Sequence, residues 1–335
     1  MRPRALSTLI LAIPLLTVAG FWLAVRDGSP GLPFYASDKP VSSPVLWGEG
    51  VISTRDDEFG AQVVPSKTEA GSGTLFFSRS VPRSQFYTIL VSRFGQGRWS
   101  EPAIAPFSGT WRDCDPALTP DGSRLYFASD RPHDGKPATD FDLWYVDRVG
   151  AGWSAARHLE GAPNSAGAEH FASATRDGTL YFTSDRPGGK GTIDVYRSRL
   201  VNGRYAEAEN LGDAINKPGW ANIEAYVAPD ESYLLVGAFG HQDSVGDSDL
   251  FVSYRKQGVW GPLVNLGPRI NSAARDYSPR VSPDGRTLFF ASERGLPTSR
   301  TRPRTYRDWV AATTGTLNGL GNIYQVDLKA ALPPA

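Results

Sequence analysis

The chain has 335 residues, and 40% of them are hydrophobic, which is ample for a globular core. Lysine plus arginine and aspartate plus glutamate each number 35, so the formal net charge is zero. A general nucleic-acid-binding protein carries a basic excess, so this composition excludes that class and predicts no nucleic-acid partner. Glycine and proline are frequent, at 35 and 26 residues, as expected where many short strands need many turns.

Residues 1–27 differ from the rest of the chain. Arg2 and Arg4 precede an apolar run over residues 5–25, which is about long enough to span a bilayer. A positive start followed by an apolar stretch is typical of a signal peptide or a signal anchor, and both alternatives stay open. We therefore expect a periplasmic or other extracytoplasmic protein, whose N-terminal segment is cleaved or contacts or spans the membrane. Residues 28–42, rich in glycine, proline and serine, predict a linker.

One motif returns five times along the remaining chain, at a spacing of roughly 54 residues. Its clearest copy begins with the turn residues Pro120-Asp121-Gly122 and continues into an alternating apolar run that ends in Ser129-Asp130-Arg131. The copies occupy residues 73–79, 120–131, 176–186, 229–236 and 283–294. Repeats of this length indicate a propeller or a solenoid.

A single repeat, residues 113–160, distinguishes these two architectures. Turn residues divide it into four segments rich in β-formers. We predict strands over residues 115–119, 124–129, 142–148 and 153–159. Four antiparallel strands per repeat indicate a propeller blade, so we expect an all-β, five-bladed β-propeller of four-stranded antiparallel blades.

The two ends of the repeat region predict how the ring closes. The fifth repeat reaches its third strand at residues 322–328 and has no fourth strand after it. Residues 44–53 resemble the fourth-strand segment 262–271 of the repeat before it. We therefore expect the N-terminal strand to complete the last blade, which removes exposed sheet edges. This places the propeller at residues 43–328 and a C-terminal tail at 329–335.

The repeat resembles a known family. Residues 276–294 fit the pattern D-x-x-P-x-x-S-P-D-G-x-x-L-x-F-x-S-[DE]-R closely. This pattern is similar to the TolB-type, WD40-like propeller repeat of bacterial envelope proteins. The resemblance implies the fold, but its relatives are variously binding modules, partners of peptidoglycan-associated proteins and caps on serine peptidases. The sequence has no G-x-S-x-G elbow of a peptidase and no peptidoglycan-binding domain.

The first strand of each blade begins with a polar residue at one equivalent position. These residues are Glu58, Asp113, Glu169, Asn222 and Asp276, and Asp115, His170 and Glu224 stand beside them. Connectivity places this set at one mouth of the central channel, on the face of the links between blades. The acids could cap loops by accepting backbone N–H bonds. They could instead bind a polyhydroxy ligand or a hard cation such as Ca²⁺ or Mg²⁺, or cleave a glycosidic bond as paired carboxylates.

Two other features admit more than one interpretation. The Ser-Asp-Arg ends of the second strands predict a hydrogen-bond network that locks each blade. An insertion over residues 295–320 in the fifth blade carries Arg300, Arg302, Arg304 and Arg307 with Tyr306 and Trp309. Such a loop could bind an anionic glycan, a carboxylate or a protein, or be a surface loop paired with nearby acids.

We predict no cofactor apart from the open question of Ca²⁺. Residues 240–249 carry alternating acids with glycine, but lack the bidentate glutamate of a calcium loop. The four histidines show no ligand spacing, which argues against zinc. Cys114, the single cysteine, is expected to be a small half-buried residue.

We accordingly expect a non-catalytic binding module of the bacterial cell envelope rather than an enzyme. Its ligand, an envelope protein or a glycan, would lie on the channel-mouth face. The alternative is a hydrolase that acts on a glycan through channel-mouth carboxylates.

Overall fold

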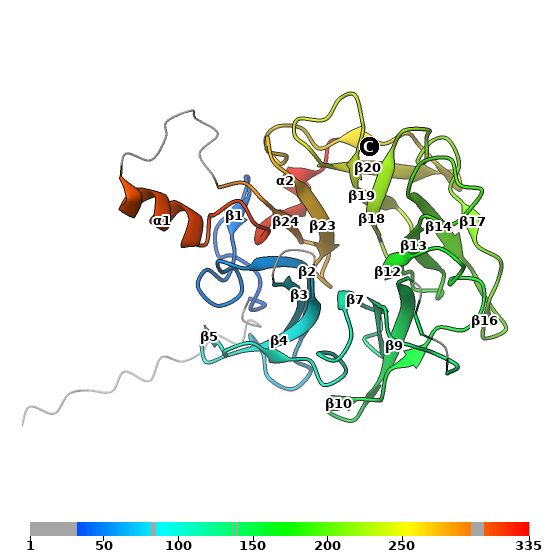
Figure 1. Ribbon diagram of the computed structural model, residues 1–335, viewed down its shortest axis with the longest axis horizontal. Helices are drawn as coiled ribbons and strands as arrows, with labels where there is room; N and C mark the ends of the chain where they lie inside the picture. Colours follow the sequence, from blue (N-terminus) through cyan, green and yellow to red (C-terminus); the bar gives the residue numbers. More distant parts are fainter. Residues whose placement is uncertain (1–31, 82–84, 136, 139, 296–304, 335) are drawn as a thin grey trace, which may run out of the picture. The chain divides into compact units, whose positions relative to one another are not determined.

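The computed structural model describes residues 32–81, 85–135, 137–138, 140–295 and 305–334. The predicted signal or anchor segment 1–27 lies outside this range. Within the described part of the chain, no helix is both long and apolar enough to cross a membrane. Residues 32–335 form one compact unit, and Figure 1 shows its sheets arranged around a central axis.

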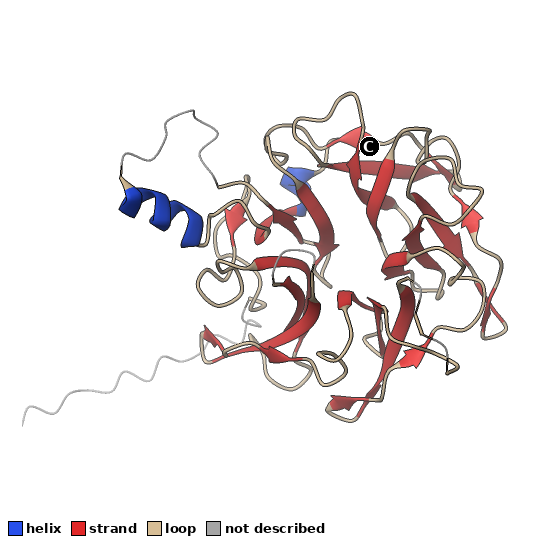
Figure 2. Cartoon of the chain, viewed as in Figure 1, coloured by secondary structure: helices blue, strands red, loops and turns tan. Residues whose placement is uncertain are grey.

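The predicted five-bladed β-propeller is confirmed, and Figure 2 shows that strands dominate it. Blade one contains β2 (Asp57–Pro65), β3 (Gly73–Ser80), β4 (Tyr87–Gly95), β5 (Arg98–Trp99) and β6 (Ala103–Ile104). Blade two contains β7 (Asp113–Leu118), β8 (Arg124–Ser129), β9 (Asp142–Val149), β10 (Gly152–Trp153) and β11 (Arg157–His158). Blade three contains β12 (Glu169–Ala174), β13 (Leu180–Ser184), β14 (Asp194–Ser198) and β17 (Glu209–Asn210), with the hairpin β15 (Leu200–Val201) and β16 (Arg204–Tyr205).

The last two blades follow the same order. Blade four contains β18 (Ala221–Val227), β19 (Tyr233–Phe239), β20 (Asp249–Lys256), β21 (Val259–Trp260) and β22 (Val264–Asn265). Blade five contains β23 (Asp276–Val281), β24 (Thr287–Ser292), β25 (Asn322–Asp327) and β1 (Val45–Leu46). In blade two, the fourth strand predicted over 153–159 is split into β10 and β11, and both pieces pair with β9.

The N-terminal strand closes the ring as predicted. In β1, Val45 pairs with Gln325 and Leu46 with Tyr324, so residues from opposite ends of the chain complete one sheet. The indole of Trp47 then packs on Phe289 at a ring-centroid distance of 4.6 Å. This pairing covers an edge that would otherwise expose unpaired backbone groups.

Residues outside the predicted propeller also pack on it. Phe34 and Tyr35, from the predicted linker, join the core cluster between blades one and five. The short helix α2 (Leu328–Ala331) buries Leu328 and Ala331 in the core cluster of blades four and five. The packed unit therefore extends beyond 43–328 on both sides.

The innermost strand of every blade carries a β-bulge or irregularity in its pairing with the second strand. In four blades a bulge residue has a positive φ: Gly60, Asp115, Phe171 and Ser278. A bulge redirects side chains and interrupts the two-residue alternation of the strand. This irregularity decides which polar residues face the channel.

Candidate functional site

The five equivalent strand-entry residues, predicted to surround the channel mouth, are all buried. Glu58, Asp113, Glu169, Asn222 and Asp276 are each 0% exposed, and none of them lines the channel cavity of about 310 Å³. The physical reason is charge pairing: four of the five are acids, and each of these acids lies within reach of an arginine from its own second strand or the loop after it. We call these four carboxylates with their arginines the blade locks.

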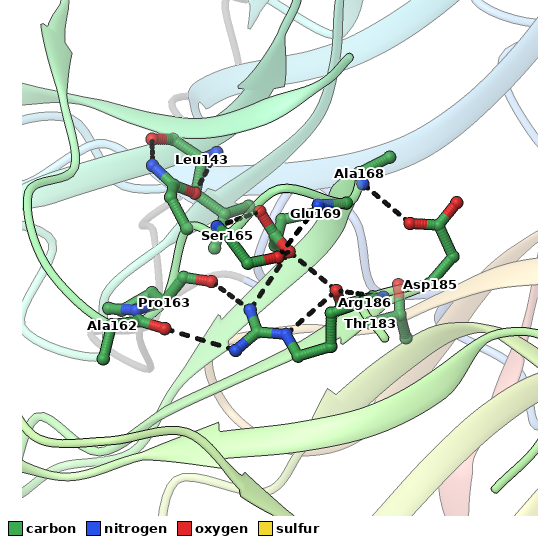
Figure 3. A network of polar contacts seen from close by, with 12 residues as sticks. Leu143, Ala162, Pro163, Ser165, Ala168, Glu169, Thr183, Asp185 and Arg186 are labelled. Atoms are coloured by element: carbon green, nitrogen blue, oxygen red, sulfur yellow. Dashed lines mark hydrogen bonds and ion pairs between the residues drawn. The ribbon is translucent and has the colours of Figure 1, made fainter. Parts of the chain in front are cut away.

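Blade three shows how a lock is built (Figure 3). The Arg186 guanidinium donates to Glu169 at 3.0 Å and to the carbonyls of Ala162 and Pro163. Ser184 Oγ and Ser165 Oγ donate to the same carboxylate at 2.6 and 2.5 Å. Burial raises the pKa of Glu169, while these hydrogen bonds and the arginine act in the opposite direction. The predicted Ser-Asp-Arg network is thus present, and its serine and arginine bind the strand-entry acid.

Blade four has no such lock. Asn222 is paired across the sheet with Ala238, whereas the equivalent acids of blades two, three and five are paired with a serine. Its amide donates to Ile215 O and Asn216 Oδ1 at 3.0 and 2.9 Å. Gly240 occupies the position of the lock arginine. A neutral amide replaces the acid in the blade where the cation is also missing.

The predicted arginine-rich insertion is only partly described. Arg300, Arg302 and Arg304 lie outside the described residues, whereas Arg307 is exposed on α1 (Tyr306–Thr314). Thr305 caps this helix by a reciprocal capping box with Asp308. Figure 1 places α1 at the outer edge of the ring, away from its centre.

A cavity of about 310 Å³ lies in the channel near the face of the blade links. Residues from the innermost strands of all five blades line it: Asp57, Phe59, Cys114, Asp115, His170, Ile223, Glu224 and Tyr277. His170, predicted at the channel mouth, is partly exposed here. Four acids reach this cavity, Asp57, Asp115, Asp185 and Glu224. Three of them, Asp57, Asp115 and Glu224, stand on the innermost strands, one or two residues from the lock positions in sequence.

Glu224 is the most perturbed of the three acids. Its side chain is 9% exposed, and Oε1 accepts a hydrogen bond from Ser278 Oγ at 3.2 Å, whereas Oε2 has no partner among the described residues. Burial, followed by repulsion from Asp115, raises the pKa of Glu224 to about 8. Gly237 stands opposite it, where a Cβ would lie 2.5 Å from Oε2. The carboxyl group is therefore protonated at neutral pH and held in a space that glycine leaves open.

Asp115 is held in place by its backbone. Its φ of 59° is strained for a residue other than glycine. The Asp115 N–H donates to Ser78 Oγ at 3.0 Å, and its carbonyl accepts from the Arg280 guanidinium at 3.4 Å. The carboxylate lies 3.5 Å from His170 Nδ1. Strain of this kind, here supported from blades one and five, is common where a side chain must point into a site.

Asp57, from blade one, is also fixed by hydrogen bonds in the lining of the cavity. Its Oδ1 accepts from Tyr277 Oη at 3.1 Å and from the Gly321 N–H at 2.9 Å. Burial raises the pKa of Tyr277 well above its ordinary value, so the phenol remains a hydrogen-bond donor. Arg275 also lines the cavity and stacks over the Tyr277 ring at 5.0 Å. The cavity therefore combines the aromatic rings of Phe59, Tyr87 and Tyr277 with several oriented polar groups.

A larger cavity, about 1270 Å³, opens at the face of the Pro-Asp-Gly turns. The acids of these turns accept hydrogen bonds from their own turns, which lowers the pKa of Asp121 and Asp230. Arg280 lines this cavity and stacks over Phe171 at 3.7 Å. The acids with lowered pKa are poor proton donors, so this cavity offers binding surface rather than acid–base chemistry.

Sequence reasoning placed Asp115, His170 and Glu224 beside the ring but did not separate them from the lock acids. Strand alternation alone would put Asp113 and Asp115 on the same side. The bulge between Cys114 and Ala117 breaks that alternation. A usable signal was present in the second strands: each Ser-Asp-Arg supplies an arginine for the strand-entry acid and for no other.

Candidate metal ligands lie in two groups among the described residues. One is Cys114, Asp115 and His170 in the channel, and the other is His133, Asp142 and His158 in blade two. In the segment 240–249, considered above as a weak calcium loop, the last acid caps the loop. Asp249 accepts hydrogen bonds from the N–H groups of Val245 and Gly246 at 2.6 and 3.0 Å. Cys114 is buried rather than half-buried, and burial raises its pKa well above the ordinary value.

Comparison with protein-family models and with curated proteins finds no match. Solved structures are similar in fold. A protein named as a glycoside hydrolase is 10% identical with a TM-score of 0.53, over 88% of this protein and 93% of that one. A BT0996 complex with RGII is 9% identical with a TM-score of 0.54, over 86% and 92%. The catalytic domain of Coprinopsis cinerea GH62 alpha-L-arabinofuranosidase is 14% identical with a TM-score of 0.48, over 88% and 98%. At these identities the similarity establishes the fold.

These findings correct the expectation of a non-catalytic binding module. Propellers of this architecture include an enzyme named as a glycoside hydrolase. The channel of this chain also holds Glu224, a buried carboxyl group whose pKa is raised and whose Oε2 has no partner among the described residues. The expectation of a non-catalytic binding module is therefore given up, and the alternative that the sequence left open is taken up as a proposal.

Proposed function

We propose that the protein is a glycoside hydrolase whose active site is the channel cavity on the link face. Glu224 is the general acid, and Asp115 is the carboxylate that activates water or attacks the sugar. One observation carries this proposal: a buried Glu224 carboxyl with a pKa raised to about 8 shares a cavity with the acid that helps to raise it. Pairs of carboxyl groups held in different environments are typical of acid and base assignments.

The chemistry needs both groups. Hydrolysis of a glycosidic bond proceeds when one carboxylic acid protonates the leaving oxygen while a second carboxylate serves as base or nucleophile. Glu224 keeps its proton at neutral pH because ionisation in a buried site is unfavourable. Asp115, fixed by Ser78 and Arg280 through its backbone, presents its carboxylate to the same space.

The remaining lining suits a sugar. Phe59 and Tyr277 offer ring surface, and His170, Arg275 and Asp57 offer polar groups for hydroxyls. At about 310 Å³, the cavity is at the lower end of the range for small-molecule sites. These dimensions support a terminal sugar residue as the group that enters, with the rest of a glycan outside.

We also propose that the propeller is related to the TolB-like repeat proteins and works outside the cytoplasm, on a glycan there. The repeat pattern at residues 276–294 and the apolar segment 5–25 behind Arg2 and Arg4 support this. A reporter enzyme that is active only in the cytoplasm, fused after Pro40, should be silent. Activity of that fusion would contradict the extracytoplasmic location.

The decisive experiment is turnover on a panel of aryl glycosides and reducing-end-labelled oligosaccharides. Glu224→Gln and Asp115→Asn should each lower kcat by about 10²- to 10⁴-fold, because each removes a proton-transfer or attacking group. Glu207→Gln, on an exposed acid of blade three, is the matched control and should leave kcat unchanged. Full turnover in both channel variants would place the active site elsewhere.

A further inference from the structure

Blade two carries a cluster of two histidines and an aspartate that the proposed hydrolase does not use. His133 Nε2 and His158 Nε2 lie 3.4 and 3.2 Å from the same oxygen, Asp142 Oδ2. The three ligand atoms lie within 4.8 Å of one another, and the imidazole rings stack at 4.0 Å with an interplanar angle of 8°. Side-chain exposures of 33, 11 and 14% for His133, Asp142 and His158 leave the cluster open to an ion from solvent.

The spacing fits a tetrahedral ion. Zinc–nitrogen and zinc–oxygen bonds of about 2.0–2.1 Å at the tetrahedral angle place neighbouring ligand atoms about 3.3 Å apart. The two contacts to Asp142 Oδ2, at 3.2 and 3.4 Å, bracket that separation. Two imidazoles and a carboxylate form a donor set that zinc uses with an open fourth position.

Each histidine also has a carboxylate behind it. His158 Nδ1 lies 3.3 Å from Glu160 Oε1, and His133 Nδ1 lies 3.7 Å from Asp134 Oδ2. A histidine that binds metal through one ring nitrogen usually has such a partner at the other, which fixes the tautomer and the ring orientation. Glu160 orients the ring of His158 in this way, whereas His133 Nδ1 has no hydrogen-bond partner among the described residues. His158 Nε2 also lies 3.1 Å from Asn164 Nδ2, a contact that an ion would displace.

Blades three and four have a different arrangement at the same place. At the place of His158, blades three and four have Asn210 and Asn265, whose amides donate to Asp194 and Asp249 at 2.8 and 2.7 Å. The next residue but one is Gly212 or Gly267 in those blades, whereas in blade two it is Glu160.

The preceding loops differ as well. In blades three and four, the aspartate that begins the third strand, Asp194 or Asp249, also accepts two backbone N–H bonds from the loop before it. In blade two, His133 from the equivalent loop approaches Asp142 instead. Blade two thus differs from blades three and four in three residues, His133, His158 and Glu160. Together these residues replace the hydrogen bonds around the aspartate by a set of possible metal ligands.

We propose that His133, Asp142 and His158 bind Zn²⁺ on the rim of blade two. Sequence reasoning argued against zinc because no two histidines have a local ligand spacing. The structure brings together residues from the loop after β8, the start of β9 and β11, because His158 pairs across the sheet with Trp144, close to Asp142. The site is independent of the proposed hydrolase.

The test uses the full chain, stripped with EDTA, dialysed and titrated with ZnCl₂ by calorimetry. One equivalent should bind with micromolar affinity or tighter, and Co²⁺ should give the intense visible bands of four-coordinate cobalt. His158→Asn, which restores the residue of blades three and four, should still fold and should weaken binding by at least about 100-fold, and Glu160→Gln by about 10-fold. His133→Gln should match His158→Asn and keeps the test valid if either variant is unstable.

His170→Gln is the control for the channel cluster and should leave Zn²⁺ binding unchanged. Absence of Zn²⁺ binding to the wild-type chain would overturn the proposal. Stoichiometric binding that survives His158→Asn and His133→Gln would overturn it too, as would loss of binding in His170→Gln alone.

Discussion

Carboxylates in two neighbouring layers of this propeller have different surroundings. Asp113, Glu169 and Asp276 lie inside their blades, and each receives an arginine and a serine hydroxyl. Asp115 and Glu224 stand two residues after the lock position of their innermost strands, and both line the channel cavity. Neither forms an ion pair with an arginine among the described residues.

The comparison shows that two acids on one innermost strand can have different roles, one structural and one that is a candidate for chemistry. An acid matched by a cation in blade after blade contributes to stability, since its charge is neutralised locally. A buried acid that lacks a matching cation tends to hold a proton or to bind a ligand. In this chain the repeated acids are structural, and the acids that do not repeat are the candidates for function.

Breaking a blade lock should have the largest effect on stability. Arg186→Ala leaves Glu169 buried without its cation, which typically costs about 3–5 kcal/mol. Chemical denaturation should show this loss with an unchanged m-value. Arg199→Ala, on a mostly exposed arginine of the same blade, is the control and should change stability little. If both variants lost the same free energy of unfolding, the buried ion pair of the lock would contribute no more than an exposed one.

Introducing an acid into the blade without a lock should have a smaller effect. Asn222→Asp places a carboxylate opposite Ala238, with Gly240 at the position of the arginine. It also turns the donor to Ile215 O into an acceptor, so about 1–3 kcal/mol should be lost. The double variant Asn222→Asp with Gly240→Arg provides the missing cation. Failure of the single variant to lower the melting temperature would contradict the charge-matching argument.

The third prediction concerns the pH dependence of stability that the raised pKa of Glu224 implies. Its folded pKa of about 8 exceeds the ordinary value of 4.5, so the unfolded chain loses this proton first. The stability contribution is complete below pH 4.5 and is lost as the pH rises to about 8. The melting temperature of the wild type should therefore fall relative to Glu224→Gln across this window and then stay level. A difference between the two that does not change with pH would show that Glu224 ionises normally.

Much of the fold could be predicted from the sequence because it depends on local chemistry that repeats. The Pro120-Asp121-Gly122 turn places Gly122 at a φ of 71°, and the alternating run after it becomes β8. The similarity between residues 44–53 and 262–271 predicted the closure that β1 makes with β25. Even the residue types of the blade locks were visible as a recurring Ser-Asp-Arg.

The functional arrangement was decided by tertiary structure. The side chain of Asp115 faces the channel because a bulge interrupts β7, and a bulge leaves no mark on the apolar pattern. The pKa of Glu224 is raised by burial and by Asp115 from another blade, neither of which is local in sequence. His133 and His158 meet only because β11 pairs with β9. Periodicity and turn chemistry determine strands, since they act over a few residues, whereas charge pairing, burial and ligand geometry depend on which strands the closed ring brings together.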